Sequence, residues 1–258
     1  MNIEQQKRIM DILKLSLLNK LKNYKPETTP MPFHTRLLGK DRMVLFSFIQ
    51  SLNTTFGTSF YEPLSKEIAS HRFNNPQIHY KVGDTISEGS SFVIQKIMDQ
   101  LTTGQYKPNK IKEIEEIRKV CQQGEARKVK PTLADVSFTD NDGILYLYDI
   151  KTVKPNKGSF IEFKRTLLTW VAASLFNNPI LKIQSFIAIP YNPYEPKPYE
   201  RWTMAGMLDL KYDLKVAEEY WDFLGGKGTY EILLDCFEKV GIELKDALDN
   251  YFQRFNGK

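Results

Sequence analysis

The sequence predicts an α/β protein in which a small β-sheet core is surrounded largely by helices. Three observations lead to this fold class. Segments at both ends have the apolar spacing of amphipathic helices, residues 131–152 have the pattern of a β-hairpin, and a mostly apolar strand follows one helix later. At 258 residues the chain can bury a full core. We expect a single domain 1–258, with a helical N-terminal part over about 1–125, a core over about 126–190 and a helical C-terminal part over about 191–258.

The N-terminal part is predicted to consist of helices and connecting loops. Thr85 or Ser87 is a suitable cap for the strongest of these helices. A proline-rich connection runs from Lys25 to Pro32, and a basic loop covers residues 124–130. Loops over residues 32–42 and 191–201 could each reach DNA, and the sequence does not choose between them. The predicted helices cover residues 2–22, 41–53, 61–70, 85–101 and 110–122.

The hairpin prediction depends on the turn sequence Asn141-Asp142-Gly143. These residues suit a three-residue loop in which glycine adopts the positive φ that other residues avoid. A loop centred on Asp142 sets Asp135 opposite Asp149, where Cβ atoms on one face are roughly 5 Å apart. Because side chains alternate along a strand, Asp149 and Lys151 share that face.

The segment after the hairpin is predicted to form a turn, a helix and a strand. Ser159 is expected to cap a helix that continues to about Phe176, and the apolar run from Ile183 to Pro190 is expected to be an internal strand. Residues 191–201 are rich in proline and tyrosine and are expected to be irregular. Two or three helices broken at Gly225-Gly226 are expected to close the chain.

The composition is that of an ordinary globular protein with a mildly basic balance. The net charge of +5 is compatible with a polyanionic partner. Two cysteines without paired spacing give no disulfide framework or zinc motif, which favours a reducing cytosol. No apolar run approaches the ~20 residues that span a bilayer. Glu4 and Asp11 argue against a signal or transit peptide.

Asp135, Asp149 and Lys151 are the residues with the clearest chemical meaning. Two carboxylates this close repel each other unless a cation neutralises them. With a divalent metal and a water molecule, such a cluster is equipped to cut a phosphodiester. The alternative is a surface hairpin in which the lysine simply neutralises both aspartates.

An acid two residues before a lysine is a common pattern, and only Asp149-Ile-Lys151 ends an apolar strand with a second aspartate placed opposite. The other five examples are expected on solvated faces or loops. They are Glu162-Phe-Lys164, Glu195-Pro-Lys197, Asp209-Leu-Lys211, Asp213-Leu-Lys215 and Glu243-Leu-Lys245.

The order of hairpin, helix and strand resembles the core of the PD-(D/E)XK nucleases. Asp135 matches the first acid of that pattern, Asp149 the second and Lys151 the lysine; Ala134 stands where the pattern has proline. More widely, the chain resembles the TdeIII/MjaII type of type II restriction endonuclease. The supporting stretches are 131–136, 149–156, 163–170 and 220–226. The resemblance implies a restriction-endonuclease-like core, a small mixed sheet flanked by helices, with substantial extra helices.

The resemblance also implies an activity and its partners. The activity is sequence-specific cleavage of double-stranded DNA at a GGNCC-type palindrome, with Mg²⁺ as cofactor and Mn²⁺ as a substitute. A homodimer is implied, as is a cognate methyltransferase in a prokaryotic host that is not a stable subunit. Asp135, Asp149 and the Ile150 carbonyl would hold the metal, and Lys151 would orient the attacking water. No membrane partner is implied.

A third acid often comes from an upstream helix in this fold. Glu88 is the candidate, and the alternative is an ordinary first-turn acid that the helix dipole favours. Glu162 has the same two interpretations, and the ordinary one is favoured. The DNA contacts also remain open. Candidates for phosphate or base contacts are Arg36, Lys40, Lys154, Lys157, Lys164, Arg165 and Arg201.

Three other functions compete with this interpretation. A repair or junction-resolving nuclease would share the core but have no fixed target sequence. A DNA-binding protein with an accidental acid cluster would bind in a salt-sensitive manner and never cut. A hydrolase of small phosphates is disfavoured because His34, His71 and His79 all lie away from the motif in the sequence.

Overall fold

A five-stranded mixed sheet forms the centre of the computed structural model, which describes the chain except residues 26–30, 152–157, 200–203 and 255–258 and the side chain of Thr132. The strand order is β1-β2-β3-β4-β5, with β1 antiparallel to β2, β2 antiparallel to β3, and β3, β4 and β5 parallel. This arrangement confirms the predicted α/β class with a mixed sheet. The strands are β1 (Asn74–Ser87), β2 (Ala126–Thr139), β3 (Ile144–Ile150), β4 (Lys182–Ile189) and β5 (Leu214–Val216).

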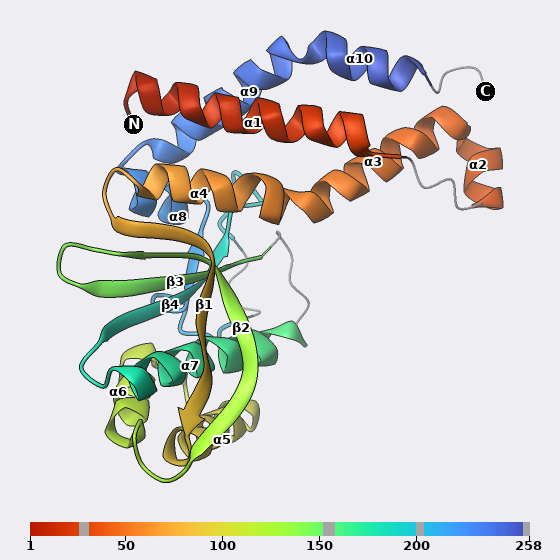
Figure 1. The fold of residues 1–258 in the computed structure, drawn as a ribbon. Coiled ribbons are helices and arrows are strands. Elements are labelled where there is room, and N and C mark those ends of the chain that lie inside the picture. Colours follow the sequence, from red (N-terminus) through yellow and green to blue (C-terminus); the bar gives the residue numbers. More distant parts are fainter. Residues whose placement is uncertain (26–30, 152–157, 200–203, 255–258) are drawn as a thin grey trace.

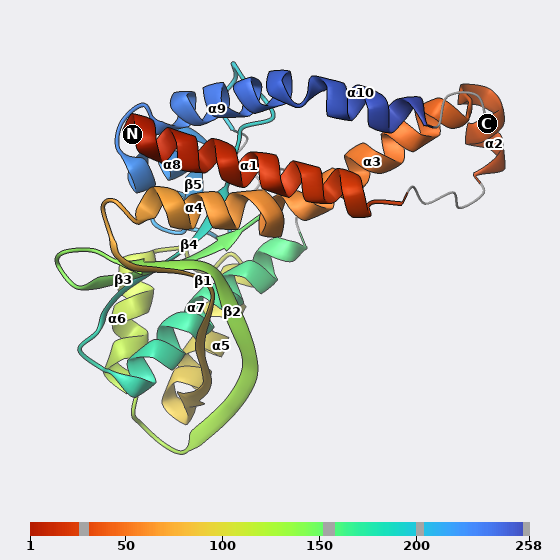
Figure 2. The ribbon, with the colours of Figure 1, turned by 45° about the horizontal axis from the view of Figure 1, so that its top comes forward.

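Helices cover both faces of the sheet and extend beyond it (Figure 1). α5, α6 and α7 lie on one side, α4 and α8 lie on the other, and α1 and α9 form a layer outside α4 (Figures 1 and 2). The helices are α1 (Ile3–Asn23), α2 (Pro32–Leu38), α3 (Lys40–Phe56), the π-helical turn η1 (Gly57–Tyr61), α4 (Glu62–Ala69), α5 (Glu88–Thr102), α6 (Lys110–Val120), α7 (Ser159–Asn177), α8 (Glu218–Gly225), α9 (Thr229–Glu243) and α10 (Lys245–Gln253). No described helix is both long and apolar enough to cross a membrane.

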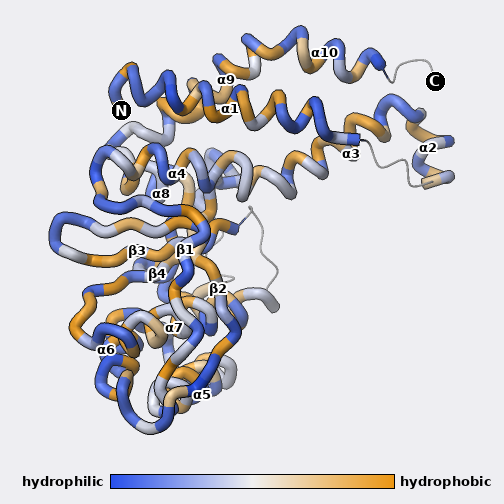
Figure 3. Tube along the Cα trace, viewed as in Figure 1, coloured by the Kyte–Doolittle hydropathy of each residue, from blue (hydrophilic) through white to orange (hydrophobic). Residues whose placement is uncertain are grey.

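α7 packs across one face of the sheet, against β1 and β4. Leu167, Leu168 and Val171 share one side of the helix and are fully buried. The long ribbon of β1 and β2 bends across this helix, and register shifts occur on both sides of Gly83. A Cβ atom at Gly83 would lie 3.4 Å from the Ala173 Cβ, so ribbon and helix are in close contact. Hydrophobic residues recur along the strands and along the helices that surround them (Figure 3).

The hairpin between β2 and β3 has the predicted loop. The Asp140 N–H donates to the Ile144 carbonyl at 3.1 Å, and Gly143 has a φ of 75°. Val136 pairs with Tyr148, which is the register that the three-residue loop predicts. The internal strand of the core is also confirmed, since β4 lies between β3 and β5.

Several predicted element boundaries were wrong for identifiable reasons. β1 was not predicted, because the N-terminal half of this strand alternates between exposed and partly exposed positions and contains few apolar residues. Thr85 belongs to this strand, so the cap of α5 is Ser87, whose hydroxyl accepts the Ser90 N–H at 3.0 Å. The basic segment 124–130 is mostly the first half of β2. Pro32 starts a helix at a position where its missing N–H costs nothing, so 32–42 forms α2 and the start of α3. Ser159 is the first residue of α7, and Gly158 occupies the cap position.

A second, smaller core joins α1, α3 and α10 beyond the sheet. Its buried residues are Leu21, Phe48 and Tyr251, and the Phe48 ring packs against the Tyr251 ring with centroids 5.7 Å apart. These helices and α2 extend past the body of the molecule (Figure 2). The N-terminal helix α1 packs against α4 and α9. Ile9 and Leu13 of α1 are buried, whereas Ile3 is largely exposed.

Candidate active site

The structure brings Asp135, Asp149 and Lys151 together at the ends of β2 and β3. Continuing the Val136–Tyr148 register by one residue places Asp135 opposite Asp149. Asp135 Oδ2 accepts the Ile150 backbone N–H at 2.7 Å. Lys151 Nζ lies 2.6 Å from Asp149 Oδ1 and 5.0 Å from the centre of the Phe163 ring at the start of α7. The hairpin and the helix therefore position the three side chains.

Burial makes this pair of carboxyl groups difficult to ionise. Desolvation raises the pKa of Asp149 to about 6; Lys151 opposes this rise, while repulsion and a hydrogen bond from Asp135 add to it. Desolvation also raises the pKa of Asp135, although the Ile150 N–H and Lys151 partly offset it. One lysine thus faces two carboxyl groups. The cluster has less positive charge than full ionisation of its acids requires.

Glu62 is a third acid near this pair, and the sequence pattern did not single it out. It begins α4, is 3% exposed, and its charge contributes to raising the pKa of Asp135. Desolvation raises the pKa of Glu62 itself. Its Oε2 lies 2.7 Å from His79 Nε2, and this histidine opposes the rise in the pKa of Glu62. The one available signal was an acid in the first turn of a predicted helix.

His79 lies beside the cluster although it is distant from it in the sequence. β1 pairs Ile78 with Val136 and Tyr80 with Ala134, so His79 lies next to Asp135 on the neighbouring strand. Its φ of 53° is uncommon for a residue with a side chain. His79 is therefore near the motif in space although it lies away from it in the sequence, because the sheet brings β1, which was not predicted, beside β2.

Glu88 lies at the other end of the β1–β2 ribbon. Ser87 pairs with Ala126, and the interval from Ala126 to Asp135 at about 3.3 Å per residue is roughly 30 Å along the strand. The Glu88 carboxylate forms an ion pair with Arg127. The expectation that Glu88 supplies the third acid is thus corrected, since the bent ribbon carries α5 away from Asp135.

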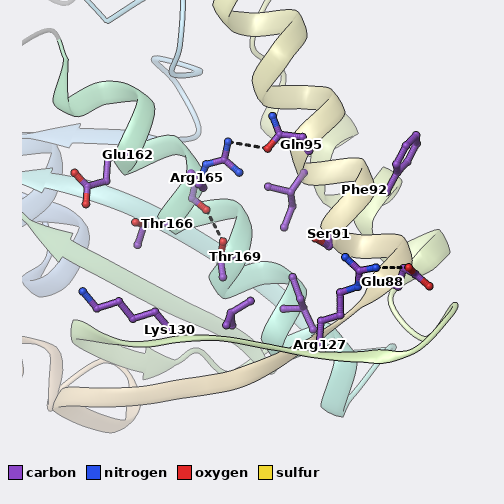
Figure 4. Close-up of a pocket in the computed structure, with 13 residues that line it drawn as sticks. Glu88, Ser91, Phe92, Gln95, Arg127, Lys130, Glu162, Arg165, Thr166 and Thr169 are labelled. Atoms are coloured by element: carbon purple, nitrogen blue, oxygen red, sulfur yellow. Dashed lines mark hydrogen bonds and ion pairs between the residues drawn. The ribbon is translucent and has the colours of Figure 1, made fainter.

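A cleft of about 640 Å³ opens between α5, α7 and β2 (Figure 4). Lys130 and Glu162 line one end, close to Phe163 and hence to Lys151. The exposed Arg165 crosses the cleft and donates to Gln95 Oε1 at 3.0 Å. The Glu88–Arg127 pair lines the far end (Figure 4). The cleft is therefore lined by three cations, Arg127, Lys130 and Arg165, and two acids, Glu88 and Glu162, and its Glu162 end adjoins Phe163 in the sequence.

Lys164, a predicted DNA contact, is fully buried and cannot reach DNA. Its Nζ lies 2.5 Å from Glu113 Oε2 and 2.5 Å from Asp213 Oδ2. Asp213 also bonds Lys110 at 2.7 Å. Two of the acid-lysine patterns expected on solvated faces, those containing Lys164 and Asp213, are thus part of a buried network. Lys164 precedes Leu167, Leu168 and Val171 at helical spacing, which was a signal for burial.

The remaining predicted DNA contacts divide between the surface and undescribed residues. Arg36 lies exposed on α2 and Lys40 lies exposed at the start of α3. Lys154, Lys157 and Arg201 fall outside the described residues. Glu162 is exposed at the cleft and makes no described ion pair with the acid cluster.

The donor atoms at the acid cluster suit a hard divalent cation. Carboxylate and backbone carbonyl oxygens are the ligands that Mg²⁺ prefers. The buried Glu62 carboxyl, whose Oε2 lies 2.7 Å from His79 Nε2, adds a further oxygen near the pair. Within the described parts of the chain, no three side chains of histidine, cysteine, aspartate or glutamate converge closely enough to hold a metal by themselves. Any such ion would therefore rely on the aspartate pair, backbone oxygen and water.

A mixed sheet flanked by helices, with acids and a lysine at the ends of its hairpin and facing a basic cleft, defines the restriction-endonuclease-like class. The sequence model of the HinfI type II restriction endonuclease family matches residues 1–241. The chain belongs to this family of type II restriction endonucleases.

Curated relatives agree with the family assignment. The chain is 29% identical over 213 residues to the type II restriction enzyme MjaII of Methanocaldococcus jannaschii, a match that covers 77% of this chain but only 55% of that relative. It is 26% identical over 216 residues to the type II restriction enzyme HgiCII of Herpetosiphon aurantiacus, covering 82% of this chain and 77% of the relative. HgiEI of the same organism is 25% identical over 217 residues, with the same coverage.

Proposed function

We propose that this protein hydrolyses phosphodiester bonds of double-stranded DNA at a specific site, with Mg²⁺ as its cofactor. The observation that carries the proposal is the charge imbalance at Asp135, Asp149 and Lys151. The buried Asp149 and the partly buried Asp135 share a single lysine, and burial together with their mutual repulsion raises the pKa of Asp149 to about 6. A cation removes that repulsion, and a scissile phosphate brings further need for positive charge.

Asp135 and Asp149, with the Ile150 carbonyl, would hold the metal in the manner of the PD-(D/E)XK pattern. When bound, Mg²⁺ supplies Lewis acidity and a more acidic water, and Mn²⁺ can take its place. Glu62 replaces Glu88 as the proposed third acid, because it is buried and its charge contributes to raising the pKa of Asp135. Its contribution would pass through water, since its side chain does not complete a three-acid cluster.

Lys151 is proposed to act on the water and phosphate at this site. Its ammonium is held between the Asp149 carboxylate and the Phe163 ring, so its position is fixed before substrate arrives. From there it orients the attacking water and supplies charge to the phosphate. Ile150 helps to position the first acid, because its N–H bonds Asp135 Oδ2.

The cleft between α5 and α7 is proposed to take the DNA next to the cut. Arg165 and Gln95 carry the forked donors and acceptors that contact phosphates or base edges, and Lys130 lies near the acid cluster's end. Because Arg165 is already bonded to Gln95, its guanidinium is oriented across the opening (Figure 4). Arg36 and Lys40, exposed on α2 and α3, remain proposed contacts.

The finer points of the proposal come from the resemblance to the TdeIII/MjaII type. They are a GGNCC-type palindrome as target, a homodimer in which each subunit cuts one strand, and a separate methyltransferase in a prokaryotic cell whose cytoplasm holds the enzyme. Relatives named as type II restriction enzymes support a sequence-specific enzyme over a repair or junction nuclease. That nuclease is the second candidate, because the same acid cluster would serve it.

A digest of plasmid DNA with and without Mg²⁺ tests the proposal. The wild type is expected to give discrete fragments whose mapped ends identify the target. Asp149→Ala and Lys151→Ala should lose cleavage by about 10³-fold or more while still binding DNA. Asp142→Ala, in the exposed hairpin loop, is the matched control and should cut normally. A smear would favour the second candidate, and cleavage at an unchanged rate by Asp149→Ala would overturn the site.

A further inference from the structure

The outermost part of the molecule carries an unusual amount of exposed apolar surface. Phe33 is 84% exposed and Leu37 is 82% exposed, four residues apart on α2. On the adjoining α3, three more large apolar side chains recur at helical spacing and are about half exposed. We call the whole set the apolar tip; its members are Met31, Phe33, Leu37, Leu38, Leu45, Phe46 and Ile49.

α2 has no apolar support from the rest of the described chain. None of its seven residues is buried, and α3 is the one described element that packs substantially against it. A helix this short is not stable in water by its own hydrogen bonds, because nucleation is unfavourable. The tip therefore needs a partner surface to be a stable part of the protein.

The size of the tip matches one side of a protein–protein interface. Its side chains expose roughly 600–700 Å², compared with about 800 Å² per partner in a standard interface. Isolated monomers rarely leave a larger apolar patch than a few hundred Å² in water. The anionic phosphates of a duplex suit the neighbouring Arg36 and Lys40, which remain proposed DNA contacts, but not the apolar side chains of Phe33 and Leu37.

We infer that the apolar tip is the homodimer contact and that its occupant is the same tip of a second copy of this chain. The inference rests on the proposed function, since one acid cluster per chain cuts one strand and two chains are needed to cut a duplex. A two-fold axis through the tip sets apolar surface against identical apolar surface. The tip also projects on the side of the molecule where α7 begins (Figures 1 and 2). Lys151 contacts the Phe163 ring near that start of α7.

Sedimentation velocity of the full chain, with and without a duplex that carries the target, tests this inference. The wild type should sediment as a pair of 30.0-kDa chains. The double variant Phe33→Asp/Leu37→Asp should sediment as a monomer with an unchanged circular dichroism spectrum. Ile180→Asp, at an 88% exposed apolar residue just after α7, adds the same kind of charge elsewhere and should remain a dimer.

A second variant keeps the test independent of whether the double variant folds. The sequence has two cysteines, Cys121 and Cys236, and both are buried, so Leu37→Cys introduces an exposed thiol that a maleimide can report. Its labelling rate should fall at least several-fold as the protein concentration rises through the dimerisation range.

The outcomes separate this inference from the proposed function. A wild type that is monomeric with and without DNA, a double variant that remains dimeric, or labelling independent of concentration would overturn the tip as the interface. A dimer that is disrupted by the tip substitutions but cuts no DNA would support the tip and refute the nuclease. A wild type that cuts both strands as a monomer would support the nuclease and refute the tip as the dimer contact.

Discussion

Asp149 and Asp213 are both buried aspartates that bond lysine ammonium groups, yet their pKa values move in opposite directions. Burial would raise the pKa of Asp213, but Lys110 and Lys164 together hold it below its ordinary value. Burial raises the pKa of Asp149 to about 6, because Lys151 alone opposes it and Asp135 adds repulsion. The number of lysines per carboxyl group, rather than burial, separates the two clusters.

The difference distinguishes a structural cluster from a reactive one. The inner cluster pairs two lysines with two acids, Glu113 and Asp213, and Ser185 and backbone donors satisfy further atoms. Such a network is complete without any ligand. The outer cluster at the end of the hairpin keeps an excess of carboxyl groups at the mouth of a basic cleft. Its incomplete charge balance is what makes room for a cation.

The largest expected loss of stability comes from a substitution in the inner cluster. Asp213→Asn leaves two fully buried lysines with Glu113 as their remaining charged partner. We expect a loss of about 3–5 kcal/mol in the free energy of unfolding, as for other broken buried ion pairs. Urea denaturation measures it, with Asp142→Asn in the exposed loop as the control. A loss below about 1 kcal/mol would mean that the cluster is not held by charge pairing.

Asp149→Asn is expected to raise the free energy of unfolding in metal-free buffer, whereas Asp213→Asn lowers it. The folded carboxyl keeps its proton up to a pH of about 6, whereas the unfolded one loses it near 3.8, so the folded state binds more protons in that window. The contribution of Asp149 to wild-type stability therefore falls as the pH rises from 4 to 6, by at most about 3 kcal/mol. Asparagine removes this penalty.

The Asp149→Asn variant should thus match the wild type near pH 4 and be more stable above pH 6. Urea denaturation of both proteins across that range, without divalent metal, gives the difference in unfolding free energy. A variant less stable than the wild type at pH 8 would show that the carboxylate stabilises the fold, as Asp213 does.

A smaller effect, on the cleavage rate, distinguishes Glu62 from Glu88 as the third acid of the site. Glu62→Gln should slow single-turnover cleavage about 10- to 100-fold, because it removes a charge near Asp135 while keeping the shape. Glu88→Gln should leave cleavage within about threefold, because its partner is Arg127 at the far end of the cleft. If Glu88→Gln were the slower enzyme, the assignment of Glu62 would fail.

The sequence predicted the hairpin cluster well because all of its determinants are local. The turn Asn141-Asp142-Gly143 sets the register, and strand alternation then places Asp135, Asp149 and Lys151 on one face. The α/β class and the internal strand β4 followed from apolar runs of the ordinary lengths. These features need no knowledge of how distant segments meet.

What the sequence did not predict depends on distant segments. Glu62 and His79 reach the cluster through α4 and β1, and β1 has too few apolar residues to be recognised as a strand. Lys164 was predicted to contact DNA because it follows the lysine-rich turn. Its spacing to Leu167 and Val171, which are buried, indicated instead that its side chain points into the protein. Its acid partners come from α6 and the segment before β5. No pattern within α7 identifies them.

The most direct test of the charge imbalance is the thermal unfolding of the DNA-free protein with added Mg²⁺ or Ca²⁺. A metal present at 100 times its dissociation constant stabilises the folded state by about 2.7 kcal/mol. The account predicts a clear rise in the unfolding midpoint of the wild type and of Asp142→Asn, and none for Asp149→Asn. An equal rise in Asp149→Asn, or no rise in the wild type, would contradict the assignment of Asp135 and Asp149 as the metal site.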